Sequence, residues 1–185
     1  DFAAQVPHGA VRTYVMGDRG ARNEMATPEE VAAMGAIVKE GLEAGALGFS
    51  TTRTILHRAG DGELAPGTTA DREEVIGIGR AMGEVGYGVF EVASDLTPED
   101  PELEWMRQIG QETGLPVTFA CLQNNEDPTQ WQRLLSAVEQ DRAAGGTFTP
   151  QVAQRTAGVL LSLETSGQPV ILPDAYHRAV LLPLA

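Results

Sequence analysis

The hydrophobic residues of this chain follow one repeated pattern. Four times, a stretch with apolar residues at helical spacing ends at a glycine and is followed by a short apolar run typical of a buried strand. The central copy is Glu43-Ala44-Gly45-Ala46-Leu47-Gly48-Phe49-Ser50-Thr51-Thr52-Arg53. The other strands are expected after Gly86, Gly114 and Gly145-Gly146, at Val89 to Val92, Val117 to Cys121 and around Phe148. The pattern predicts consecutive helix–glycine–strand units.

The expected helix starts also carry recognisable sequence signals. Thr27-Pro28-Glu29-Glu30 combines a hydroxyl cap, a proline in the first turn and acidic residues near the helix N-terminus. Further helices are predicted near Asp71, after Thr97-Pro98 and at Asp127-Pro128. Near the N-terminus, Thr13-Tyr14-Val15-Met16 has the composition of a strand, and Gly17-Asp18-Arg19-Gly20 that of a turn. Leu47 to Ser50 is expected to be a strand covered on both faces.

These units define the expected fold class as α/β, with consecutive βα units around a parallel sheet and right-handed crossovers. The spacing fits part of a (β/α)8 TIM-type barrel and also an open doubly wound sheet. No Gly-x-Gly-x-x-Gly and no Gly-Lys-Ser/Thr sequence occurs, which argues against a nucleotide-binding version. Beyond Arg155 the pattern weakens, and Val159 to Leu163 fits either a helical turn or part of a lid.

Composition narrows the function classes. The 185 residues suffice for one domain, 1–185. A net charge of −13 argues against nucleic acid and against anionic membrane surfaces as partners. The single cysteine, Cys121, excludes an internal disulfide and a cysteine-only zinc cluster. Since no stretch resembles a signal peptide or a membrane span, we expect a cytoplasmic protein. Both ends of the chain look like cuts through a longer protein.

The candidate site residues follow the strands, where α/β proteins place their ligands. Ser50, Arg53 and His57 leave the central strand, and Gln123 follows a later one, so we assign these four to substrate binding. A guanidinium at Arg53 suits a substrate carboxylate, although a solvated loop arginine fits the sequence equally well. Glu91, inside an apolar run, is the candidate catalytic acid or base, unless the strand end faces solvent.

The two remaining histidines and the cysteine are not assigned to the site. His8 beside Gly9 is expected to orient a loop by hydrogen bonding, and His177 to lie on the surface. Cys121 has no base nearby in sequence and is a weak candidate for a nucleophile. The histidines form no compact metal-binding motif, so no metal ligand is assigned within this chain.

Two segments resemble the N-acyl-D-amino-acid deacylase (D-aminoacylase) branch of the amidohydrolase superfamily. They are Gly45-Ala46-Leu47-Gly48-Phe49-Ser50-Thr51, similar to that branch's Gly-Ala-Leu-Gly-x-Ser-Thr strand, and Val6-Pro7-His8-Gly9-Ala10-Val11-Arg12, similar to its Gly-His-x-x-x-Arg segment. The resemblance implies a (β/α)8 barrel that hydrolyses an amide with zinc. It also implies that this chain supplies only the middle strands of a larger barrel, roughly the fourth to the seventh.

The departures from that pattern keep a second interpretation open. Where the family has histidines at two strand ends, this chain reads Glu91-Val92-Ala93-Ser94 and Ala120-Cys121-Leu122-Gln123. We therefore expect zinc, if present, to belong to a full-length parent and not to be held by this fragment. The parent is expected to hydrolyse a C–N bond of an N-acylated amino acid or similar small molecule. The alternatives are a non-catalytic barrel relative that acts as a binding or assembly module, and a stand-alone open α/β domain. Open strand edges also predict a homo-oligomer, or coverage of the edges by residues 155–185.

Overall fold

The sheet confirms the predicted parallel arrangement. The computed structural model describes residues 2–97, 102–123 and 127–154. Its strands are β1 (Val6–Pro7), β2 (Gly48–Arg53), β3 (Val89–Ser94), β4 (Val117–Ala120) and β5 (Phe148–Gln151). All four neighbouring pairs are parallel, and the spatial order is the order along the chain, β1-β2-β3-β4-β5. Among the described strands the order never reverses, as expected of consecutive barrel units and unlike a doubly wound sheet.

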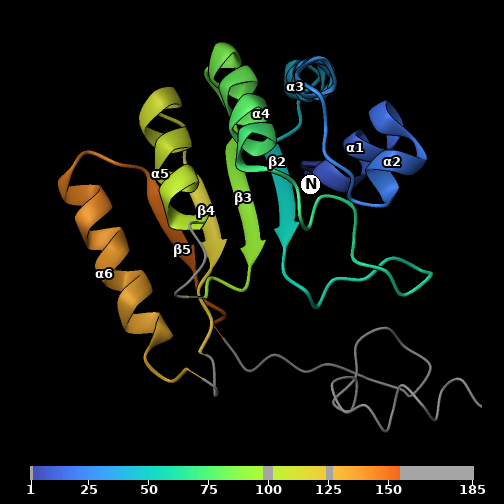
Figure 1. The fold of residues 1–185 in the computed structure, drawn as a ribbon. Helices are drawn as coiled ribbons and strands as arrows, with labels where there is room; N and C mark the ends of the chain where they lie inside the picture. The colour runs from blue at the N-terminus through green and yellow to red at the C-terminus, as the bar shows by residue number, and fades with distance from the viewer. Residues whose placement is uncertain (1, 98–101, 124–126, 155–185) are drawn as a thin grey trace, which may run out of the picture.

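Six helices connect these strands in the described part of the chain, and the larger ones form a layer along one face of the sheet (Figure 1). They are α1 (His8–Met16), α2 (Asp18–Ala21), α3 (Pro28–Glu43), α4 (Arg72–Val85), α5 (Glu102–Thr113) and α6 (Gln130–Ala143). The predicted start of α3 is confirmed, because Thr27 and Glu30 form a capping box that satisfies two backbone N–H groups. At the start of α4, the side chain of Asp71 accepts a hydrogen bond from the backbone N–H of Glu73.

The core lies between the sheet and this helix layer. Phe49, Phe90, Val117 and Phe148 stand in register across four strands, each at most 1% exposed. The Phe90 ring contacts both Phe49 and, edge-on, the α5 residue Trp105. Because side chains alternate along a strand, the residues next to this row point to the opposite face of the sheet. That opposite face is therefore built from Ser50, Glu91 and their neighbours across the strands.

The glycines that punctuate the sequence have the predicted conformation. Gly45, Gly86, Gly114 and Gly145 follow α3, α4, α5 and α6 with φ of 104°, 73°, 71° and 80°. A left-handed residue at that position turns the chain back toward the sheet, and only glycine adopts it without a steric penalty. The repeated helix–glycine–strand pattern thus reports the real connections of the fold.

Three local expectations were wrong. Thr13 to Met16 belongs to α1 and not to a strand, because His8, Arg12 and Met16 recur at helical spacing and are all buried. The hydrophobic pattern does not reveal this buried stripe, because two of its members, His8 and Arg12, are polar. The following turn is the short helix α2, entered through Gly17 at φ 60°. Leu47 precedes β2 and is 48% exposed, so the strand begins one residue later than expected.

The opposite face of β2 is less covered than expected, since Ser50 is only half-buried. The expectations for Val159 to Leu163, for His177 and for coverage of the edges by residues 155–185 lie outside the described residues. The homo-oligomer stays a prediction. Within the described ranges, no helix combines the length and apolar character that crossing a membrane requires.

Candidate functional site

A cleft of about 310 Å³ opens at the carboxyl ends of β1, β2 and β3. Its walls come from these strand ends and from the long connection between β2 and α4, which closes one side. The lining residues are Pro7, His8, Gly9, Ser50, Thr51, Thr52, His57, Ala65, Pro66, Glu91 and Ala93. Parallel sheets bind ligands at this end of their strands.

The strand register places polar groups next to one another on the cleft side of the sheet. Ser50 pairs with Glu91 across β2 and β3, and Glu91 pairs with Thr118 across β3 and β4. A half-buried carboxylate therefore lies between two hydroxyl side chains. Among the described residues, Glu91 makes no hydrogen bond or ion pair, so its oxygens are available to a ligand or a water molecule.

Three of the five predicted site residues line this cleft together: Ser50, His57 and Glu91. His57 comes from the connection after β2 and is held by Thr52, whose Oγ1 lies 2.6 Å from His57 Nδ1. This hydrogen bond fixes one ring nitrogen and leaves Nε2 for a ligand. Thr52, which the sequence did not single out, is thus a further cleft residue.

Arg53 has a different environment from the one proposed. Its side chain is on the helix side of the sheet, where Nη2 lies 3.0 Å from the carboxylate of Glu102. It also donates to the carbonyl oxygen of Ala70, and only 13% of its side chain is exposed. The guanidinium ties the end of the connection between β2 and α4 to α5. Its proposed contact with substrate stays a prediction, and most of its donors are already used.

Gln123 and Cys121 follow β4 outside the cleft lining. Gln123 is exposed, and its role in substrate binding stays a prediction. Cys121 continues the helix-facing alternation of Val117 and Phe119 and is 6% exposed. Burial raises the pKa of its thiol, so the thiolate needed for nucleophilic attack is disfavoured at neutral pH.

A buried polar network that the sequence did not predict includes two of the residues that line the cleft, His8 and Thr51. His8 places Nδ1 2.8 Å from Thr51 Oγ1 and Nε2 2.8 Å from Glu74 Oε1. Arg12 donates from Nε to the same oxygen of Glu74 at 2.8 Å. His8 does hydrogen bond as expected, but its partners are in β2 and α4.

Glu74 is the central group of this network. Burial acts to raise its pKa, but the hydrogen bonds from His8 and Arg12 outweigh that effect, so the pKa of Glu74 is lowered and the carboxylate is ionised. Both ring nitrogens of His8 are therefore engaged, Nε2 with Glu74 and Nδ1 with Thr51. The only sequence signal for Glu74 is its spacing of four and eight residues from Ile78 and Met82, which are buried on the same stripe.

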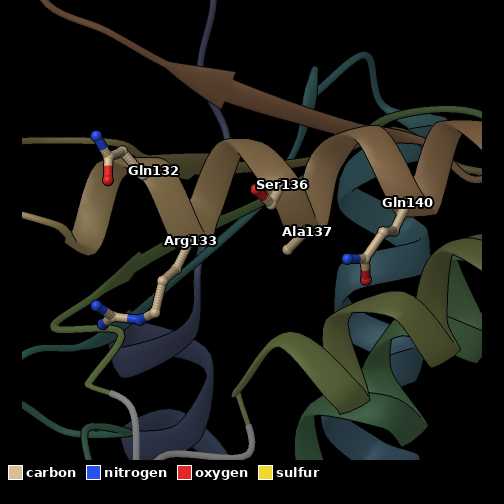
Figure 2. A pocket seen from close by; sticks show the side chains of 5 residues that line it. All are labelled: Gln132, Arg133, Ser136, Ala137 and Gln140. Carbon is tan, nitrogen blue, oxygen red and sulfur yellow. The ribbon is translucent and has the colours of Figure 1, made fainter.

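A second depression, of about 370 Å³, lies on α6 and is lined by Gln132, Arg133, Ser136, Ala137 and Gln140 (Figure 2). All its residues come from one helix, and Arg133 is paired with Asp127 at 2.7 Å. Because no groups from other elements converge there, it lacks the arrangement of a catalytic site. The cleft at the strand ends is the stronger candidate.

The described residues do not fit a zinc site. No three or more histidine, cysteine, aspartate or glutamate side chains cluster there in a geometry that could hold a metal ion. Glu91 and Cys121 stand in the two strand-end segments where the family pattern has histidines, and by their alternation they point to opposite faces of the sheet. Three or four converging ligands are needed, and this part of the chain does not supply them.

Comparisons with known proteins agree with this geometry. The solved structure of an N-acyl-D-glutamate deacylase from Bordetella bronchiseptica, complexed with zinc and a phosphonate mimic of the tetrahedral intermediate, matches with a TM-score of 0.62 and 24% sequence identity. The match covers 80% of this chain but 29% of that chain, and it confirms barrel-type βα units. No curated protein sequence matches. The sequence profile of the amidohydrolase family, however, matches residues 1–179. This chain therefore belongs to the amidohydrolase family.

Proposed function

We propose that this chain is the middle part of an amidohydrolase barrel that hydrolyses the C–N bond of a small N-acylated compound, such as an N-acylated amino acid. Membership of the family supports the reaction class. The observation that carries the proposal is the cleft at the strand ends, which gathers Ser50, His57 and Glu91. Barrel enzymes place their catalytic groups at this position.

The cleft residues suit the proton transfers of amide hydrolysis. Glu91, unpartnered among the described residues, would take a proton from the water whose oxygen attacks the amide carbonyl carbon. His57, oriented through Nδ1 by Thr52, would give a proton from Nε2 to the departing amine nitrogen. The hydroxyl of Ser50, beside Glu91 on the adjacent strand, would orient the substrate. No step is assigned to a metal, because the described residues do not form a metal site.

The chain spans about three tenths of the deacylase structure it matches. We propose that the rest of the substrate pocket comes from other parts of a longer protein. The function is therefore tested on the full-length protein that contains this chain. Its hydrolysis of a panel of N-acylated amino acids and N-acylated amines is measured for the wild type, Glu91→Gln and Glu139→Gln.

Glu139 is exposed on α6 and makes no hydrogen bond to the described residues, so Glu139→Gln repeats the change of charge away from the cleft. We expect Glu91→Gln to lower kcat by about 10²-fold or more, the usual contribution of a general base, and Glu139→Gln to leave it unchanged. No hydrolysis of any compound, or full activity of Glu91→Gln, would overturn the proposal.

A second candidate function is a binding or assembly module that retains the barrel without catalysis. It is favoured by the ends of β3 and β4, which carry Ala93-Ser94 and Cys121-Leu122 and none of the histidines of the family pattern. Under this proposal the panel compounds bind to the full-length protein but are recovered unchanged. Calorimetric binding measured together with product analysis separates the two functions.

A further inference from the structure

We infer that the wall of the cleft built by this chain selects its ligand by charge: it favours a cationic group, accepts an uncharged one and rejects a carboxylate, with Glu91 as the residue that discriminates. This inference rests on the proposed function for the ligand being an amide substrate, and it names the charge class of that substrate. It places an uncharged or cationic part of the substrate beside Glu91, so the carboxylate of an N-acylated amino acid would be held by parts of the pocket outside this chain.

The first argument is the charge of the lining. Glu91 is the one acidic residue among the eleven that line the cleft, and no lysine or arginine is among them. Its neighbours across the sheet, Ser50 and Thr118, carry neutral hydroxyl groups. Within the described residues nothing pairs with Glu91, so its negative charge acts on whatever occupies the cleft.

The second argument is that the nearby arginines are already neutralised. Arg12 lies 2.8 Å from Glu74 in the buried network, and Arg53 lies 3.0 Å from Glu102. Each is thereby part of a neutral pair. A carboxylate ligand is held in proteins by a free guanidinium or ammonium group, often through two parallel hydrogen bonds. The described part of the cleft offers no such group.

The third argument concerns His8 and the connection between β2 and α4. His8 shares its two ring nitrogens with Thr51 and Glu74, so it has none free for a ligand. Arg58, the remaining cation of the connection between β2 and α4, is exposed and donates to the carbonyl oxygen of Gly62. It is not among the residues that line the cleft. Around the whole molecule a net charge of −13 attracts cations and repels anions.

The test compares three acetamides of similar length that differ at one end. N-(4-aminobutyl)acetamide ends in an ammonium group, N-butylacetamide is neutral, and 4-acetamidobutanoate ends in a carboxylate. Binding to the 185-residue chain is measured by NMR titration at pH 8 and low salt, where charge interactions are screened least. We expect the ammonium compound to bind about tenfold more tightly than the neutral one, and the carboxylate compound most weakly.

Two variants identify the source of the preference. Glu91→Gln keeps the shape of the side chain and is expected to reduce the preference for the ammonium compound to less than twofold. Glu139→Gln, with the same change in net charge, is expected to keep it. Raising the salt to 0.5 M is expected to shrink the wild-type preference, because screening weakens a charge interaction.

Equal binding of the three compounds, tighter binding of the carboxylate, a preference that survives Glu91→Gln, or no binding of the ammonium compound would each overturn the inference. The measurement involves no turnover. The binding preference can therefore be interpreted even if the proposed hydrolysis fails. The hydrolysis test can likewise be interpreted if the binding preference is not found.

Discussion

The buried ion pair between Arg12 and Glu74 gives the sharpest stability prediction. Arg12 is fully buried and Glu74 is 1% exposed, and the two meet at 2.8 Å. Arg12 also donates to the carbonyl oxygens of Gly20 and Glu24, so its charge is tied to α1 and α2 as well as to α4. Glu74→Met removes the carboxylate while keeping the side chain long and apolar. The guanidinium then stays buried without a counter-ion.

The size of the effect follows from this geometry. Opposite charges about 4 Å apart attract by about 4 kcal/mol at an effective dielectric constant near 20. Breaking a buried pair on one side costs about 3–5 kcal/mol in measured cases, because the remaining charge is left unpaired. A domain of this kind is stable by about 5–15 kcal/mol in total. We therefore expect Glu74→Met to remove a large part of the free energy of unfolding.

The assay is equilibrium unfolding in urea, followed by circular dichroism. The double variant Arg12→Met/Glu74→Met is expected to be more stable than Glu74→Met alone, since replacing both partners with apolar groups removes the unpaired charge. The matched control is the exposed pair Lys39–Glu84, at 3.0 Å, where Glu84→Met should leave the urea midpoint nearly unchanged. A loss below about 1 kcal/mol for Glu74→Met, or a double variant weaker than both single ones, would refute the reasoning.

Three further predictions use the same assay. Because the pKa of Glu74 is lowered in the folded state, its contribution is present above the ordinary carboxyl pKa of about 4.3 and is lost as the pH falls through the lower folded value. The wild type should therefore lose more stability between pH 6 and pH 3.5 than Arg12→Met/Glu74→Met, and equal losses would contradict this. Gly67→Ala should cost about 1–3 kcal/mol, because Gly67 has φ 96° and a Cβ there would lie 2.7 Å from His8 Nδ1. Gly60→Ala, which meets nothing within 4 Å, should change stability by less than about 0.5 kcal/mol, and an equal loss at both glycines would count against the close approach to His8. Thr27→Ala should cost about 1 kcal/mol through loss of the α3 capping box, and an unchanged urea midpoint would speak against the cap.

Much of the fold could be predicted because its signals are local. The capping residues before α3 and α4, the glycines after each helix and the apolar stripes reflect interactions within a few residues. Met34, Met82 and Met106 fall on apolar stripes at helical spacing, which predicts core positions, and all three are fully buried. The error at Thr13 to Met16 arose where a buried stripe is carried by His8 and Arg12, whose partners lie far away in the chain.

The candidate site was predicted only in part for the same reason. Ser50 and Glu91 could be placed near each other, because the ends of neighbouring parallel strands meet at one edge of the sheet. The partner of Arg53 could not be predicted, since Glu102 is 49 positions away and reaches it only through the packing of α5 on the sheet. A sequence gives the residue types that are available for chemistry, but the partners that use up their charges depend on the fold.

The sequence by itself determined the order of helices and strands, the parallel sheet and the strand ends that carry the cleft. These features follow from periodicity, capping and backbone preferences that act over short stretches. Only the tertiary structure decided that Glu91 lacks a partner among the described residues while the nearby arginines are neutralised. Ion pairing depends on distances between side chains from different elements, and these distances exist only once the helices have packed on the sheet.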